Sequence, residues 1–223
     1  MLEVCIDSLE SAIAAEQGGA HRLEVCANLS VGGLTPAYTL LTEIRDRSSI
    51  PIMMMVRPRP GDFCYQEAEL DGMIKSIQQA KEMDLYGVVF GTLLPTGHLD
   101  RVAVSKLMEH CDGLAVTFHR AYDVCTDTNA ALDFLLEQGV SRLLTSGKEA
   151  TAYEGRQHIA DLVKAYGSQI SIMAGSGLTS DNVLPIVQST MVREVHGSCK
   201  SASSGADTDA KVVSDIVSQL GKL

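Results

Sequence analysis

The sequence predicts a (β/α)8 barrel of the TIM type, and three observations support this fold class. Eight short apolar runs recur along the chain, the stretches between them have helical character, and most runs end at a polar residue or a glycine cluster. The spacing of about 20 to 35 residues fits repeated βα units. A barrel of this kind has typically about 250 residues and can be trimmed towards 200. We therefore expect residues 1–223 to form a single barrel domain.

The apolar runs are the expected strands. They cover residues 2–6, 22–26, 52–56, 86–90, 114–118, 141–145, 170–173 and 192–196. In a parallel barrel the carboxyl ends of all strands meet at one mouth, and that mouth is where ligands bind.

Capping residues mark the expected helices between the runs. The first helix should begin at Ser8, whose hydroxyl caps free amide groups, and end at Gly18 and Gly19. The second should begin near Pro36, and residues 67–83 repeat the helical pattern. The later helix signals are Asp127 or Thr128, Gly139, Thr179 or Ser180, and Thr208 or Asp209.

The position of the glycine clusters separates the barrel from a doubly wound open sheet. An open sheet usually has a glycine-rich turn after its first strand, but here that turn contains no glycine. The cluster Gly175-Ser176-Gly177 follows the seventh run, and Gly197-Ser198 follows the eighth. Loops after the last two strands of a barrel often bind phosphate. We therefore predict an anion site at Gly175, Ser176 and Gly177.

Composition limits the classes of partner. The net charge of −10 disfavours nucleic acid and anionic membranes, which select basic surfaces. No apolar run approaches the length of a membrane span, and no signal-like segment precedes the first strand, so we expect a cytoplasmic protein. The six cysteines show no CxxC spacing and should be reduced. A metal ion or a small anionic metabolite is the favoured ligand.

Alternation along the strands separates the two faces of each run. The apolar faces should meet the helices, which leaves Glu3, Arg22, Glu24 and Arg57 pointing into the barrel. Buried charges cost several kcal/mol unless they are paired, so these four should compensate one another. One interpretation is an ion-pair network that only holds the barrel together. On the eighth run the inward face, and with it the position of His196, is ambiguous.

A second interpretation is an enzyme acting on a small carboxylate- or phosphate-bearing metabolite. Arg57 would hold the anion, because an arginine fork suits both groups. Glu24 and His119 would transfer protons, with Glu24 or Asp123 orienting the imidazole. The competing explanation for His119 is a structural histidine at a strand end.

Sulfur ligands suggest a third interpretation. Cys5 and Cys26 end neighbouring strands on corresponding faces, and Met53 and Met55 lie one strand further on. Thiolate and thioether ligands favour Cu(I), and two sulfurs can hold it. The alternative is that both cysteines are small core residues.

The strand-end motifs together resemble the CutC family of copper homeostasis proteins. Matches run from Glu3 to about His196, and so many motifs in order are specific for that family. The motifs are Glu3-Val4-Cys5-Ile6-Asp7-Ser8, Arg22-Leu23-Glu24-Val25-Cys26, Gly32-Gly33-Leu34-Thr35-Pro36, Val56-Arg57-Pro58-Arg59, Gly61-Asp62-Phe63, Thr117-Phe118-His119-Arg120-Ala121, Leu144-Thr145-Ser146-Gly147 and Val195-His196.

The resemblance implies a cytoplasmic barrel that forms homo-oligomers and is associated with copper. The cysteines linked to Cu(I) in that family would correspond to Cys5 and Cys26. One segment departs from the pattern, because residues 197–206 are short and small where relatives often have a longer basic segment. Three hypotheses follow: a Cu(I)-binding homeostasis protein, a barrel enzyme, and a structural or partner-binding protein.

Overall fold

A computed structural model describes residues 1–205 and 207–222 and shows a closed barrel of parallel strands. Neighbouring strands follow chain order from β1 to β8, and β1 pairs with β8 to close the ring. The predicted fold class is confirmed. The strands are β1 Leu2–Ile6, β2 Arg22–Val25, β3 Ile52–Met55, β4 Gly87–Phe90, β5 Ala115–Phe118, β6 Arg142–Thr145, β7 Ser171–Gly175 and β8 Glu194–Gly197.

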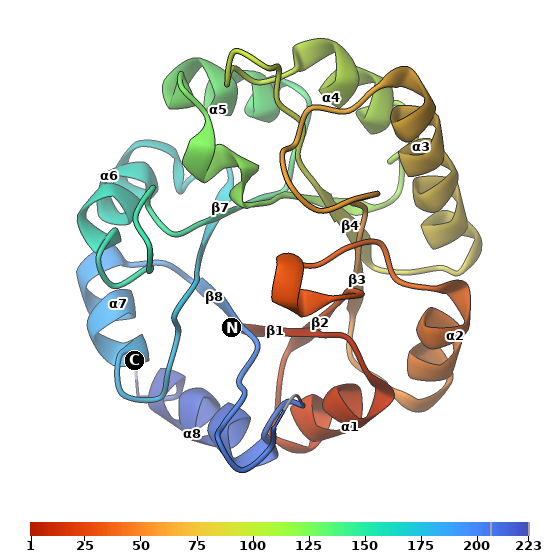
Figure 1. Cartoon of the computed structure of the whole chain (residues 1–223). Helices are drawn as coiled ribbons and strands as arrows, with labels where there is room; N and C mark the ends of the chain where they lie inside the picture. Colours follow the sequence, from red (N-terminus) through yellow and green to blue (C-terminus); the bar gives the residue numbers. More distant parts are fainter. Residues whose placement is uncertain (206, 223) are drawn as a thin grey trace.

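An outer ring of helices surrounds the strands (Figure 1). The helices are α1 Leu9–Gln17, α2 Tyr38–Arg47, α3 Glu67–Glu82, α4 Arg101–Met108, α5 Thr128–Glu137, α6 Arg156–Tyr166, α7 Val183–Thr190 and α8 Ala210–Leu220. Two short 3₁₀ helices, η1 Leu29–Val31 and η2 Arg120–Val124, follow β2 and β5. Within the described part of the chain, no helix combines the length and apolar character that crossing a membrane requires.

Alternation in β1 shows how the sequence builds the two layers. Leu2, Val4 and Ile6 are fully buried in the main hydrophobic core, between the strands and the helices. Glu3 and Cys5 alternate with them and lie on the inner face of the barrel. Helix α1 packs on this outer layer, with Ser8 capping it by accepting a hydrogen bond from the Ser11 amide.

Two helix starts differ from the expected ones. Helix α2 begins at Tyr38, because Ala37 before it is extended. Helix α7 begins at Val183, and neither predicted residue caps it. Thr179 instead exchanges hydrogen bonds with Asn182, whose side-chain oxygen accepts from the Thr179 amide. This local turn uses the residues that a cap would need.

An ion-pair network fills the lower part of the barrel interior. Arg22 pairs with both Glu3 and Glu194. Glu194 also accepts a hydrogen bond of 2.6 Å from Ser171 and pairs with Arg142 at 3.2 Å. Since Glu194 contacts this network, its face of β8 points inward, which removes the ambiguity of that strand.

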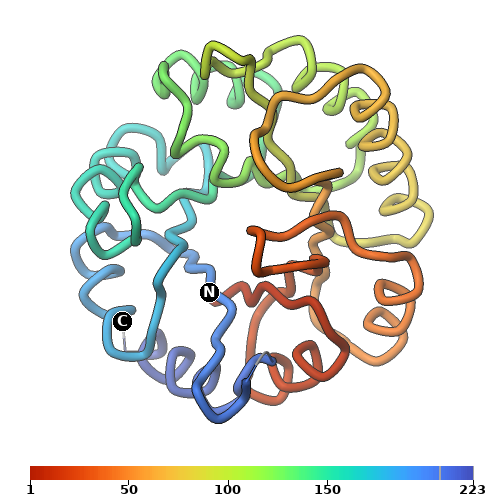
Figure 2. Tube along the Cα trace, in the orientation of Figure 1, coloured from red at the N-terminus to blue at the C-terminus, as the bar shows by residue number. Residues whose placement is uncertain are grey.

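The predicted network was right for Glu3 and Arg22 but wrong for Glu24 and Arg57. Glu24 lies two residues after Arg22 on the same face of β2 and is therefore one layer nearer the mouth, and Arg57 follows β3 beyond its last strand residue. Neither makes an ion pair with Glu3 or Arg22 among the described residues. The backbone trace in Figure 2 shows the loop carrying η1, in red-orange, lying over the middle of the ring.

Candidate functional site

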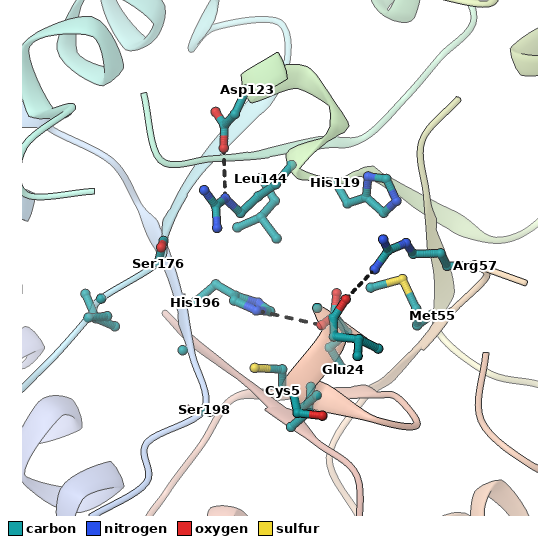
Figure 3. Close-up of a pocket in the computed structure, with 18 of the residues that line it drawn as sticks. Cys5, Glu24, Met55, Arg57, His119, Asp123, Leu144, Ser176, His196 and Ser198 are labelled. Atoms are coloured by element: carbon teal, nitrogen blue, oxygen red, sulfur yellow. Dashed lines mark hydrogen bonds and ion pairs between the residues drawn. The ribbon is translucent and has the colours of Figure 1, made fainter. Parts of the chain in front are cut away.

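A cavity of about 710 Å³ opens at the mouth of the barrel. Small-molecule sites usually occupy about 300–1,000 Å³, so this cavity is large enough for a metabolite as well as an ion. Its wall is formed by strand ends, by η1 and by the loops after β7 and β8 (Figure 3). The charged, titratable and sulfur-containing side chains on this wall include Cys5, Glu24, Met55, Arg57, His119 and His196.

Three of these side chains form one cluster, which we call the Cys-Glu-His cluster: Cys5, Glu24 and His196. One sulfur, one carboxylate oxygen and one ring nitrogen lie within 4.8 Å of one another, and all three residues are buried. The register explains the meeting, because Cys5 pairs with Glu24 across β1 and β2, while β8 lies on the other side of β1. In Figure 3 the imidazole of His196 points towards the Glu24 carboxylate.

His196 is held by carboxylates on both sides of its ring. Its Nδ1 lies 2.8 Å from Oε1 of Glu3, and its Nε2 lies 3.7 Å from Oε2 of Glu24. Burial alone would lower the pKa of His196, but the neighbouring Cys5, Glu24 and Glu3 raise it well above its ordinary value. These neighbours favour the protonated imidazole, so a metal ion that binds Nε2 must displace the proton there.

Glu3 supports His196 from below. Burial opposes ionisation of Glu3, but its contacts with His196 and Arg22 outweigh burial and lower its pKa to about 2. Glu3 is thus a fixed negative charge that orients the imidazole.

Glu24 is a less satisfied carboxylate. Burial raises its pKa, and its Oε1 has no hydrogen-bond partner among the described residues. Its Oε2 accepts a hydrogen bond from the thiol of Cys26 at 3.4 Å. A buried polar atom without a partner costs about 1–3 kcal/mol, which makes Glu24 a candidate to bind a ligand or cation.

Cys26 lies on the same inner face as Glu24 but closer to η1. It is fully buried and packs with Met53, Met55 and Val89. Burial and the neighbouring Glu24 raise the pKa of its thiol well above the ordinary value. The two sulfurs are staggered because Cys5 is in register with Glu24, two residues before Cys26.

Arg57 joins two loops of the mouth. Its Nη1 donates to the carbonyl oxygens of Val31 at 2.9 Å and Gly33 at 3.2 Å, and its Nη2 donates to Gly61 at 2.9 Å. The guanidinium also lies 4.9 Å from the centre of the Phe63 ring. Protein carbonyls thus occupy both terminal nitrogens, while the buried Nε has no hydrogen-bond partner among the described residues.

His119 is a buried, neutral imidazole. Burial and the nearby Arg57 lower its pKa to about 3. Its Nδ1 accepts a hydrogen bond of 3.1 Å from the Ala121 amide, so neither Glu24 nor Asp123 orients the ring as expected. Asp123 instead binds Arg120 and the amide of Ser146.

The predicted anion site also lies on the cavity wall. Ser176 and Gly177 line the cavity, while Gly175 ends β7 beside His196. Ser176 and Gly177 both have positive φ angles, of 85° and 68°. A Cβ atom on Gly177 would lie 2.8 Å from a methyl group of Thr151, so the loop requires glycine there.

Comparison with known proteins identifies the family. The model of the CutC family matches residues 1–201. The chain belongs to the CutC family. The protein CutC of Photobacterium profundum is 46% identical over 200 residues, which cover 90% of this chain and 82% of that protein. The human copper homeostasis protein cutC homolog is 42% identical over 201 residues, covering 90% of this chain and 74% of the human protein.

Solved structures agree with this membership. The CutC structure from Streptococcus agalactiae superposes with a TM-score of 0.85 at 33% identity, covering 89% of this chain and 98% of the other. Thiamine phosphate pyrophosphorylase from Pyrococcus furiosus superposes with a TM-score of 0.66 at 16% identity, covering 99% and 95% of the two chains. The second likeness shows the barrel fold alone. The CutC resemblance seen in the strand-end motifs is confirmed.

His196 is the residue of the Cys-Glu-His cluster whose position the sequence does not predict. The Val195-His196 motif is part of the family resemblance, but strand alternation does not show which residues of β8 face inward. The useful signal was Glu194, because a carboxylate two residues before His196 on the same face needs a buried cation such as Arg22.

Proposed function

We propose that this chain binds Cu(I) at the mouth of the barrel, with Cys5 and His196 as the principal ligands. The observation that carries the proposal is the approach of sulfur, nitrogen and oxygen donors within 4.8 Å in the Cys-Glu-His cluster. The name of the human relative as a copper homeostasis protein supports copper as the cargo.

The donor set suits a soft ion. Thiolate sulfur favours Cu(I), and imidazole nitrogen is a common copper ligand. The thioether of Met55 lines the same cavity and is a further soft donor. The carboxylate of Glu24 is a hard donor, so we assign it the role of balancing charge beside the two soft ligands.

Cys26, the other cysteine of the sequence prediction, lies two residues beyond Glu24 on the same face. Its buried thiol must lose a proton before it can bind a metal, and burial opposes that loss. We therefore rank Cys5 above Cys26 as a ligand, and the pairing of Cys5 with Cys26 stays a prediction. A cytoplasmic location and homo-oligomers also stay predictions.

Anaerobic Cu(I) titration against a chromogenic chelator tests the proposal. We expect Cys5→Ser to weaken binding by more than the roughly 10–100-fold that loss of a group supporting a metal ligand costs. His196→Gln should weaken it as well, and Cys26→Ser should weaken it less than Cys5→Ser. Cys64→Ser is the matched control, because Cys64 is a half-buried cysteine that does not line the cavity. Equal affinity of wild type and Cys5→Ser would refute the assignment.

A further inference from the structure

A second part of the cavity wall is formed by the loops that follow β7 and β8. These strands are neighbours, with Gly175 opposite His196. The two loops therefore meet at one side of the mouth, where Gly177, Ser198 and Lys200 line the cavity. All three are at least partly exposed, so a ligand in the cavity can reach them.

Backbone donors are available in both loops. Over the described residues, the amide groups of Gly177 and Ser198 have no hydrogen-bond partner in the protein. Contacts with the loop after β6 fix the shape of the first loop, because Ser176 donates to Ala150 and accepts from the amide of Ala152. These contacts support the positive φ of Ser176 and Gly177.

The charge of the cavity wall differs from that of the whole chain. The chain has 18 Lys and Arg residues against 28 Asp and Glu residues. On the cavity wall, by contrast, cations outnumber carboxylates: Arg57, Arg120 and Lys200 against Glu24 and Asp123. Net positive charge on the wall of a cleft attracts anionic ligands.

Lys200 is the cation that this wall leaves available. The terminal nitrogens of Arg57 bind carbonyl groups, and Arg120 binds Asp123 and Ser146. The ammonium of Lys200 has no ion pair or hydrogen bond within the described ranges. A ligand anion at this side of the mouth would therefore meet one lysine and two backbone amides.

We propose that the loops after β7 and β8 bind the phosphate group of a small phosphorylated metabolite, held by the amides of Gly177 and Ser198 and the ammonium of Lys200. Donors that converge from two loops suit the tetrahedral oxygens of phosphate. A planar carboxylate is best recognised by two free terminal nitrogens of an arginine, and both terminal nitrogens of Arg57 and one of Arg120 already donate to protein oxygens. The remaining volume of the cavity accommodates the rest of the molecule. This inference goes beyond copper binding and does not depend on it.

Amide-resolved NMR of the ¹⁵N-labelled full chain, in copper-free buffer, tests the proposal. The probes are sn-glycerol 3-phosphate, inorganic phosphate, and glycerol as the neutral control. We expect glycerol 3-phosphate to shift the amide signals of Gly177 and Ser198 most, and glycerol to leave them unchanged. If inorganic phosphate shifts the same signals and binds as tightly as glycerol 3-phosphate, the site binds free phosphate, and the proposal of a phosphorylated metabolite is wrong. Unshifted signals with both phosphates would overturn the site itself.

A charge variant provides the second arm. Lys200→Gln should weaken binding of glycerol 3-phosphate about ten-fold, the loss expected for one charge-assisted hydrogen bond. Lys164→Gln is the matched control, because Lys164 lies in the last turn of α6 and outside the cavity wall. Equal weakening by the two variants would show attraction by net charge alone and would overturn the proposed site.

Discussion

Glu3 and His196 face each other across the line where β1 and β8 close the barrel, with Oε1 of Glu3 2.8 Å from Nδ1 of His196. The same carboxylate pairs with Arg22 through its other oxygen. One buried charge therefore connects the ion-pair network of the interior with the Cys-Glu-His cluster at the mouth. Stability and metal affinity should both depend on Glu3.

Glu3→Gln keeps the size of the side chain and removes its charge. We expect the free energy of unfolding to fall by about 3–5 kcal/mol, because Arg22 and His196 lose a buried partner. Cu(I) affinity should fall by roughly 10–100-fold, since the support of a metal ligand is lost. Urea unfolding and Cu(I) titration measure the two effects. Glu43→Gln, at an exposed position of α2, is the control, and a Glu3→Gln variant that matched it in both measurements would contradict the connection.

His119 should make stability depend on pH. Its folded pKa of about 3 lies far below the ordinary value of 6.5. As the pH falls from about 6.5 to about 3, the unfolded chain binds a proton that the folded chain does not. The free energy of unfolding should therefore decrease by up to about 1.4 kcal/mol per pH unit from this group, and the effect should vanish above about pH 6.5.

Urea unfolding between about pH 7 and pH 5 checks this expectation. His119→Gln should show a shallower decrease than the wild type, because it lacks the titrating imidazole. His98→Gln, at an exposed histidine, is the control for loss of an imidazole elsewhere in the chain. Identical slopes for wild type and His119→Gln would show that the imidazole does not contribute.

Gly91 provides the space that the His119 ring occupies. A Cβ atom there would lie 2.5 Å from Nδ1 of His119 and 2.9 Å from the Cβ of Ala121. Gly91→Ala should therefore destabilise the fold by about 1–3 kcal/mol. Gly72→Ala is the matched control in α3, where a Cβ meets nothing within 4 Å, and it should stabilise the fold by up to about 1 kcal/mol. Thermal unfolding compares the two, and loss of stability in both variants would rule out crowding at His119 as the cause.

Arg57→Met should loosen the mouth without changing the barrel. The variant removes the hydrogen bonds from Arg57 to Val31, Gly33 and Gly61. Hydrogen exchange should accelerate in residues 28–34 and 60–64, while the strands exchange as before. Arg45→Met, at an exposed position of α2, is the control. Unchanged exchange in both loops would show that other contacts hold them.

Periodicity alone located the strands and most helices, because each has an apolar face that must be buried. Ser8, Asp127 and Asp209 cap helices as expected. The register between neighbouring strands was harder to predict from the sequence, because it depends on the stagger of the closed barrel. For this reason the sequence placed Cys5 beside Cys26, whereas the register pairs Cys5 with Glu24.

Side-chain partners at the mouth were the hardest to predict. Arg57 and His119 were correctly expected near the strand ends and line the cavity. Their contacts are with backbone groups of Gly61 and Ala121, and such contacts leave no pattern in the sequence. Proximity to the mouth therefore followed from topology, but the role of each side chain required the loop conformations.

The Cys-Glu-His cluster joins strands from opposite ends of the chain. Glu3 and His196 are 193 positions apart, and Cys5 and Glu24 come from β1 and β2. A chain synthesised only as far as β7 contains Cys5 and Glu24 but lacks His196, so it cannot complete the cluster. Copper at this site would therefore bind only after the barrel closes, and each bound ion would oppose reopening between β1 and β8 by mass action.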